Sequence, residues 1–176
     1  MTSAASPSEQ RGRPDPAGLE RDGFSLWASG SPKQALEALE QALQAKPNAA
    51  NLIAAFLLAD GLGDQPRRDR LLEELCTKLQ RQVPRMVAIG RMMRDALAGG
   101  GKASLDLATV DKVLRDMPPR TRGNAEFLVG RFLLNRGQTE SARKYLQLAA
   151  DSGQTHPDLK QIAANSLRSP AAGKGP

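Results

Sequence analysis

Aromatic and β-branched side chains are scarce in this sequence. Its 176 residues include four Phe, one Trp, one Tyr, five Val and three Ile, against 26 Ala and 24 Leu. Strands are rich in β-branched and aromatic residues, whereas Ala and Leu are among the best helix formers. The composition therefore disfavours an all-β or α/β fold and predicts an all-α protein. So few aromatic side chains also leave little material for a base-stacking platform or a large cofactor pocket, and we expect no cofactor.

Cysteine and histidine each occur once. A single cysteine, Cys76, cannot form a disulfide within the chain, which is typical of a protein from a reducing compartment. Cys76 shares an apolar stripe with Leu72, Leu75 and Leu79, so we expect a buried thiol rather than a reactive one. With His156 as the only histidine, the sequence offers no histidine cluster for a metal and no Cys–His pair with an orienting partner. We expect no metal site, and we expect His156, beside a predicted helix cap, to be a solvated loop residue.

Long hydrophobic runs are also absent. The longest apolar stretch, residues 52–59, is less than half of the roughly 18 to 20 residues needed to span a bilayer, so no membrane partner is expected. The first residues, MTSAASPSEQRGRPDPAG, have no hydrophobic run after their first charges, so we expect no secretory signal and a cytoplasmic location. Residues 1–15 and 169–176 are rich in Ser, Pro and Gly, which predicts two disordered tails around a helical domain over 16–168.

Between these tails, apolar residues recur at helical spacing in stretches separated by Gly and Pro, which predicts short helices joined by tight turns. Ser31, Pro32 and Gln34 place a cap, a first-turn proline and a capping-box residue in register, so a helix is expected to begin at Pro32. Thr155 and Asp158 repeat this arrangement ahead of the last helix, where their side chains are expected to satisfy each other's free backbone N–H groups. The expected helices cover residues 17–29, 32–45, 48–60, 66–82, 85–98, 107–117, 122–136, 139–152 and 156–168.

The sequence matches itself at an offset of 107 residues. A segment near its start and a segment near its end share two glycines, two leucines and two alanines at identical spacing. In a helix hairpin, the first glycine and the first alanine would let the two helices approach closely, and the second glycine would supply the turn. The remaining positions would face the seam between repeats. The matched pairs are Gly23/Gly130, Leu26/Leu133, Gly30/Gly137, Ala35/Ala142, Leu39/Leu146 and Ala42/Ala149.

These spacings resemble the tetratricopeptide repeat, a helix–turn–helix of about 34 residues. DGFSLWASGSPKQALEALEQALQAKPN matches the pattern through its closing Pro47, and NAEFLVGRFLLNRGQTESARKYLQLAADSG matches it except that Gln154 stands at the proline site. Two further hairpins are expected between these segments. They depart from the pattern, because Leu57 and Asp60 stand where small and aromatic residues are expected and neither central loop has the usual short turn. The resemblance implies a right-handed α-solenoid of about four antiparallel helix hairpins, with 156–168 as a capping helix.

The same resemblance implies a non-catalytic scaffold whose first helices line a concave face that binds a peptide or a partner protein. No enzyme is expected. The Gly-rich residues 99–102 lack the first glycine and the following hydroxyl residue of a phosphate-binding loop, and pairs such as Glu73 and Glu74 are typical of a solvated face. The concave-face candidates are Phe24, Leu52, Phe56, Arg91, Arg131 and Asn135.

Charge supplies a second hypothesis. The chain carries 25 Lys and Arg against 19 Asp and Glu, a net charge of +6, which favours acidic partners. Residues 66–94 contain eight bases against three acids, so a nucleic-acid-binding solenoid with a basic patch is the alternative function. The same bases could equally be dispersed, solvated positions, and a homo-oligomer that uses the binding surface on itself is a third alternative. The patch candidates are Arg67, Arg68, Arg70, Lys78, Arg81, Arg85 and Arg94.

Overall fold

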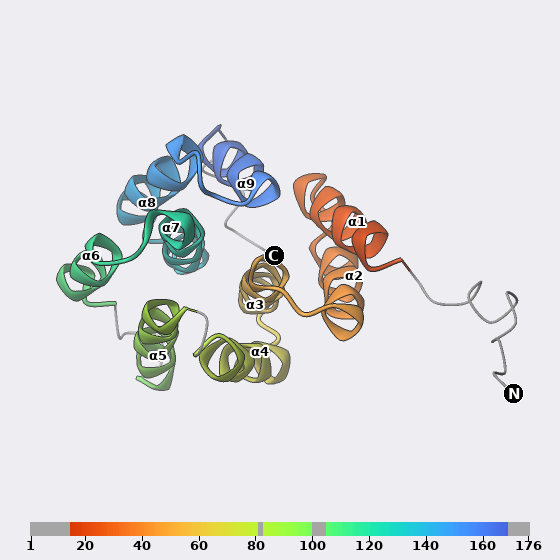
Figure 1. Ribbon diagram of the computed structural model, residues 1–176, viewed down its shortest axis with the longest axis horizontal. Coiled ribbons are helices and arrows are strands. Elements are labelled where there is room, and N and C mark those ends of the chain that lie inside the picture. Colours follow the sequence, from red (N-terminus) through yellow and green to blue (C-terminus); the bar gives the residue numbers. More distant parts are fainter. Residues whose placement is uncertain (1–14, 81–82, 100–104, 169–176) are drawn as a thin grey trace, which may run out of the picture.

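A computed structural model of the chain describes residues 15–80, 83–99 and 105–168. These residues form nine α-helices and no strand (Figure 1), which confirms the all-α prediction. No helix among them combines the length and the apolar character that a membrane crossing requires. The expected tails, apart from residue 15, lie outside the described residues. The helices are α1 (Pro16–Ala28), α2 (Pro32–Ala45), α3 (Ala49–Gly61), α4 (Gln65–Lys78), α5 (Pro84–Ala98), α6 (Leu107–Arg115), α7 (Pro119–Asn135), α8 (Thr139–Asp151) and α9 (Pro157–Arg168).

The helix positions agree with the sequence pattern to within a few residues. Helix α2 begins at Pro32, as expected, but the Ser31 side chain makes no cap bond. The Ser31 backbone instead joins the turn, donating to Leu26 O at 2.8 Å. The expected cap by Thr155 is also wrong, because its hydroxyl donates to the Ala149 carbonyl of the preceding helix at 2.8 Å. Proline in the first turn and apolar periodicity therefore set these helix starts without the expected side-chain caps.

Three hairpins have a glycine with a positive φ in the turn between their two helices. Gly30, between α1 and α2, has a φ of 85°, and Gly137, between α7 and α8, has a φ of 72°. Gly63, between α3 and α4, has a φ of 70°, so this central hairpin does have a short turn, contrary to expectation. Only glycine adopts this backbone conformation readily. In each turn the residue after the glycine donates its N–H to the carbonyl five positions earlier, at 2.8 to 3.0 Å, so the central hairpin shares the turn geometry of the two hairpins that match in sequence.

The two best-matched hairpins also share one close helix contact. A Cβ atom placed on Gly23 would lie 2.7 Å from Leu39 Cγ, and a Cβ atom on Gly130 would lie 2.8 Å from Leu146 Cγ. A larger residue at Gly130 would meet the backbone nitrogen of Leu146 at 3.0 Å, whereas one at Gly23 would mainly meet the Leu39 side chain. The matched glycines therefore mark a repeated close contact between paired helices, as the sequence predicted, but Leu39 and Leu146, expected at the seam between repeats, lie in this contact within each hairpin.

Helices adjacent in the chain pack against each other and follow one another around the molecule (Figure 1). Among the contacts between helices that are not adjacent in the chain, α3 packs against α7 and α1 packs against α9, which are far apart in the sequence. In an open solenoid each repeat touches only its neighbours. The expected open concave face is therefore not formed, because the first helices α3 and α7 cover each other. Helix α3 is buried from Ala50 to Ala59, which explains the longest apolar run as a helix surrounded on all sides.

Candidate functional site

A partly buried ion pair closes the contact between α3 and α7. Asp60, near the end of α3, accepts from the two terminal nitrogens of Arg136 at 2.8 and 2.9 Å. The Asn135 amide donates to the Asp60 carboxylate at 3.0 Å and to the Leu57 carbonyl at 3.1 Å. The Arg136 guanidinium also lies over the Phe132 ring. Asn135, expected on the binding face, thus belongs to an internal contact, and this pairing explains why Asp60 departs from the repeat pattern.

The apolar concave-face candidates are buried. Phe56 is fully buried and stacks on Phe132, with 6.3 Å between the ring centroids. Phe24 is 3% exposed and stacks on His156 at 5.6 Å. Leu52 is buried too, at the base of a groove. Contrary to expectation, these residues do not line an open face, because the pairing of α3 with α7 and of α1 with α9 fills the space in front of them.

The two arginine candidates have different surroundings. Arg131 on α7 donates to Ser166 Oγ at 3.0 Å, and its guanidinium lies 5.5 Å from the centroid of the Trp27 ring. Burial lowers the pKa of Arg131 to about 10, because the charged form loses its hydration. Arg91 on α5 is exposed. Of the six concave-face candidates, Arg91 is therefore the one whose side chain is exposed.

Most of the basic patch candidates that the structure describes pair with carboxylates. Arg67 and Arg70 of α4 both contact Glu40 of α2, and Arg70 and Lys78 contact Glu74 of their own helix. Glu40 lies outside the segment whose charges predicted the patch, so counting along the chain overstated the positive charge of this surface. Exposed ion pairs add little stability, but they reduce the local potential that attracts phosphates. Among the other candidates, Arg68 pairs with Asp69 at 2.7 Å, Arg94 pairs with Glu73 at 3.3 Å, Arg85 is exposed and Arg81 lies outside the described residues.

A groove lies between the end of α2, the start of α3 and the end of α4. Its volume is about 70 Å³, which suits one apolar side chain and falls well below the roughly 300 to 1,000 Å³ of small-molecule sites. Leu43, Leu52 and Leu79 give it an apolar lining, and Glu74 and Lys78 form an ion pair of 2.7 Å beside them. The lining residues are Leu43, Pro47, Asn48, Ala49, Leu52, Glu74, Lys78 and Leu79.

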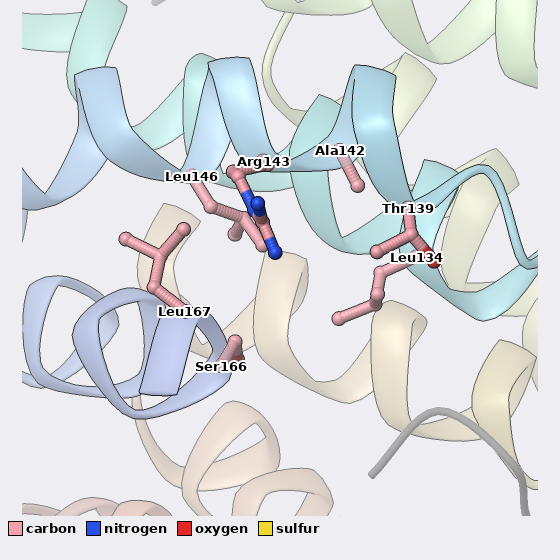
Figure 2. Close-up of a pocket in the computed structure, with 7 residues that line it drawn as sticks. All are labelled: Leu134, Thr139, Ala142, Arg143, Leu146, Ser166 and Leu167. Carbon is pink, nitrogen blue, oxygen red and sulfur yellow. The ribbon is translucent and has the colours of Figure 1, made fainter. Parts of the chain in front are cut away.

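A second hollow lies between α7, α8 and α9 (Figure 2). Arg143 of α8 points into the space between α8 and α9, and Ser166 of α9 lines it from the opposite side. The volume of this hollow is about 10 Å³, about enough for one water molecule. It is therefore too small for a substrate or a cofactor. The lining residues are Leu134, Thr139, Ala142, Arg143, Leu146, Ser166 and Leu167.

The cysteine and the histidine differ in how well they were predicted. Cys76 is buried as expected, and burial raises the pKa of its thiol, which disfavours the nucleophilic thiolate. The His156 side chain is only 30% exposed, so the expectation of a solvated residue is wrong. Its ring packs on Phe24, and Glu20 and Asp158 flank its two nitrogens at 3.6 and 3.7 Å. Residue spacing along the chain carries no signal for this group, because one histidine meets carboxylates from two helices that are far apart in the sequence.

Two further polar groups had no signal in the sequence. Lys144 and Tyr145 of α8 donate to the Asp111 carboxylate of α6 at 2.7 and 2.8 Å, and these contacts hold the pKa of Asp111 below its ordinary value. Glu126 of α7 is 7% exposed, and burial raises the pKa of its carboxyl group. Both environments arise from helix packing, which local sequence patterns do not specify.

Comparison of the chain with family models, with curated proteins and with solved structures finds no match. The geometry of the helices and their surfaces is therefore the basis for the function proposed below.

Proposed function

We propose that the protein is a helical-repeat protein of the tetratricopeptide type and serves as a non-catalytic interaction module for a peptide or a partner protein. The shared turns of three hairpins and the matched close contacts of Gly23 and Gly130 support the repeat. The groove between α2, α3 and α4 is the observation that carries the binding role. We place the partner there rather than on a concave face, because α3 and α7 cover each other.

The groove selects for one kind of contact. Its apolar lining and its volume of about 70 Å³ suit a single apolar anchor side chain from an extended segment or a helix. Complete burial of such a side chain is worth about 1.5 to 3 kcal/mol. Glu74 and Lys78 stand beside the anchor position, where they can pair with charges that flank the anchor in the partner sequence. A preferred partner segment therefore has one apolar residue between charged residues of both signs.

The alternative, a nucleic-acid-binding solenoid, has less support. Arg67, Arg70 and Lys78 are engaged with carboxylates, while Arg85 and Arg91 are exposed on α5. Binding through phosphate contacts weakens steeply as salt rises. A polynucleotide shift at low salt that disappears with added salt would favour this alternative over the groove.

Site-specific photo-crosslinking in the producing cells tests the groove. A photoreactive residue at Lys78, beside the groove, is expected to give a discrete protein adduct, whereas one at the exposed Lys112 of α6 is not. Ala49→Gln lengthens a side chain that lines the groove and should abolish the adduct. The matched change Ala88→Gln, at a half-buried alanine of α5, should leave the adduct intact. Equal adducts from both positions, or adducts insensitive to Ala49→Gln, would contradict the proposal.

A further inference from the structure

Three side chains of metal-binding types meet where α1 and α9 begin. Glu20 starts the second turn of α1, His156 directly precedes α9, and Asp158 lies in the first turn of α9. One ligand atom from each of the three lies within 4.8 Å of the other two. The distance from Glu20 Oε1 to His156 Nε2 is 3.6 Å, and that from His156 Nδ1 to Asp158 Oδ2 is 3.7 Å. Both exceed the usual length of a direct hydrogen bond, so the three groups converge without bonding one another.

Neighbouring groups hold these side chains in place. Asn48 and Asn51 of α3 donate their amides to Glu20 Oε2 at 3.0 and 3.2 Å, which leaves Oε1 beside His156. The backbone N–H of His156 donates to Asn124 Oδ1 at 2.8 Å, and its ring stacks on an aromatic ring of α1. Outer contacts of this kind orient metal ligands and reduce the entropy that they lose on binding.

Two buried polar atoms at this junction have no hydrogen-bond partner within the part of the chain that the structure describes. They are Nδ1 of His156 and Oδ1 of Asn51. Asn51 is 1% exposed, and its amide lies against Glu20. Folded proteins rarely leave such atoms unpaired. A cation would balance the two carboxylates and bind an imidazole nitrogen.

We propose that Glu20, His156 and Asp158 form a binding site for a divalent transition-metal ion of the zinc type. Bonds of about 2.0 to 2.2 Å in a tetrahedral zinc site place the ligand atoms about 3.3 to 3.6 Å apart. One ion binds a single nitrogen of His156, and one ligand atom from each of the three residues lies within 4.8 Å of the other two, so small side-chain rotations are needed to bring all three onto one ion. The imidazole ligand favours zinc over magnesium and calcium, which prefer oxygen ligands. The bound ion joins α1 to α9, the first and the last of the described helices. It therefore links the beginning and the end of the helical domain.

Thermal unfolding of the untagged, chelator-treated chain with added Zn²⁺ tests the site. At free Zn²⁺ about 100 times the dissociation constant, Tm should rise by roughly 5 to 10 °C, and Mg²⁺ should give no comparable shift. Glu20→Gln and Asp158→Asn, which keep the shape of each side chain, should each lose most of the Zn²⁺ shift. Asp22→Asn is the matched control, because it removes an exposed carboxylate of α1 outside the cluster and should keep the shift.

Visible absorption of bound Co²⁺ gives a second readout that does not depend on stability. The wild-type chain should give the intense bands of a four-coordinate ion, and His156→Gln should lose them. The proposal is overturned if Zn²⁺ leaves the Tm of the wild-type chain unchanged, or if all three ligand variants bind as the wild type does.

Discussion

The close contact between α7 and α8 allows a sharp test of the repeat. A Cβ atom on Gly130 would lie 2.8 Å from Leu146 Cγ and 3.0 Å from both Leu146 Cδ2 and the Leu146 backbone nitrogen. Carbon atoms in favourable contact are about 3.5 to 4.0 Å apart. Gly130→Ala therefore forces the two helices apart, because the backbone of Leu146 cannot move without moving α8.

Two effects of this substitution oppose each other. Alanine is better than glycine in a helix interior by about 0.5 to 1 kcal/mol. Overpacking a tight contact costs about 1 to 3 kcal/mol, and the upper half of that range applies here because one clashing atom is backbone. We expect Gly130→Ala to lower the free energy of unfolding by about 1 to 2.5 kcal/mol. Gly23→Ala should cost less, because its Cβ would lie 3.4 Å from the Leu39 backbone nitrogen and mainly meets the movable side chain.

Urea unfolding followed by far-UV circular dichroism measures these differences. Gly61→Ala is the control, because its Cβ would lie no closer than 3.4 Å to the Asn135 side chain, and it should be nearly neutral. In a Leu146→Ala background the cost of Gly130→Ala should shrink, since the clashing side-chain atoms are gone. A neutral or stabilising Gly130→Ala in the wild-type background would refute the close contact and the shared hairpin geometry.

Three further predictions concern polar groups. Asp60→Ala leaves the Arg136 charge without its carboxylate at the α3–α7 contact and should lower the free energy of urea unfolding by about 3 kcal/mol; a loss under about 1 kcal/mol would show that this pair does not hold the contact. Tyr145→Phe removes a hydrogen bond to Asp111 and should cost about 1 kcal/mol at neutral pH. The folded-state pKa of Asp111 lies below its ordinary 3.8, so its contribution is present above that pH and is lost as the pH falls through the folded value. The stabilities of the wild type and this variant should then converge in acid, and a constant gap would contradict the assigned bond. Arg131→Met removes a charge that burial penalises, so Tm at pH 7 should stay equal or rise, and a clear fall would show that the contacts of this arginine outweigh the penalty.

The helices and turns could be predicted from the sequence because their signals are local. Pro32 fits only the first turn of a helix, and Gly30 and Gly137 mark turns that need positive φ. The close contacts of Gly23 and Gly130 were predictable for a similar reason, since a hairpin fixes which faces of its two helices meet.

The pairing of α3 with α7 had no local signal. Asp60 and Arg136 stand 76 positions apart, and neither residue differs in its immediate sequence from a solvated charge. One signal was present, because the run from Leu52 to Ala59 is apolar on every side of its helix, and such a helix is buried all round. Because a helix that is apolar on every side is buried, this run predicts that Leu52 and Phe56 belong to the core rather than to a binding face.

The groove and the basic surface depended on how separate helices come together. The groove uses the ends of α2, α3 and α4, and none of its lining residues belongs to a recognisable motif. Along the sequence of α4, basic residues outnumber acidic ones. In the folded chain, Glu40 of α2 pairs with two of these bases and so reduces the positive charge of the surface. Counts of charge along one segment cannot include partners from another.

The interaction role is tested most directly by the affinity with which the partner protein, once recovered by crosslinking at Lys78, binds this chain. Isothermal titration calorimetry of that partner with the wild type, Ala49→Gln and Ala88→Gln gives the three affinities. Ala49→Gln fills the groove, whereas Ala88→Gln makes the same change on α5, outside the groove. The groove account predicts that Ala49→Gln weakens binding at least tenfold, about 1.4 kcal/mol, while Ala88→Gln leaves it unchanged. Equal affinities for all three chains would contradict it.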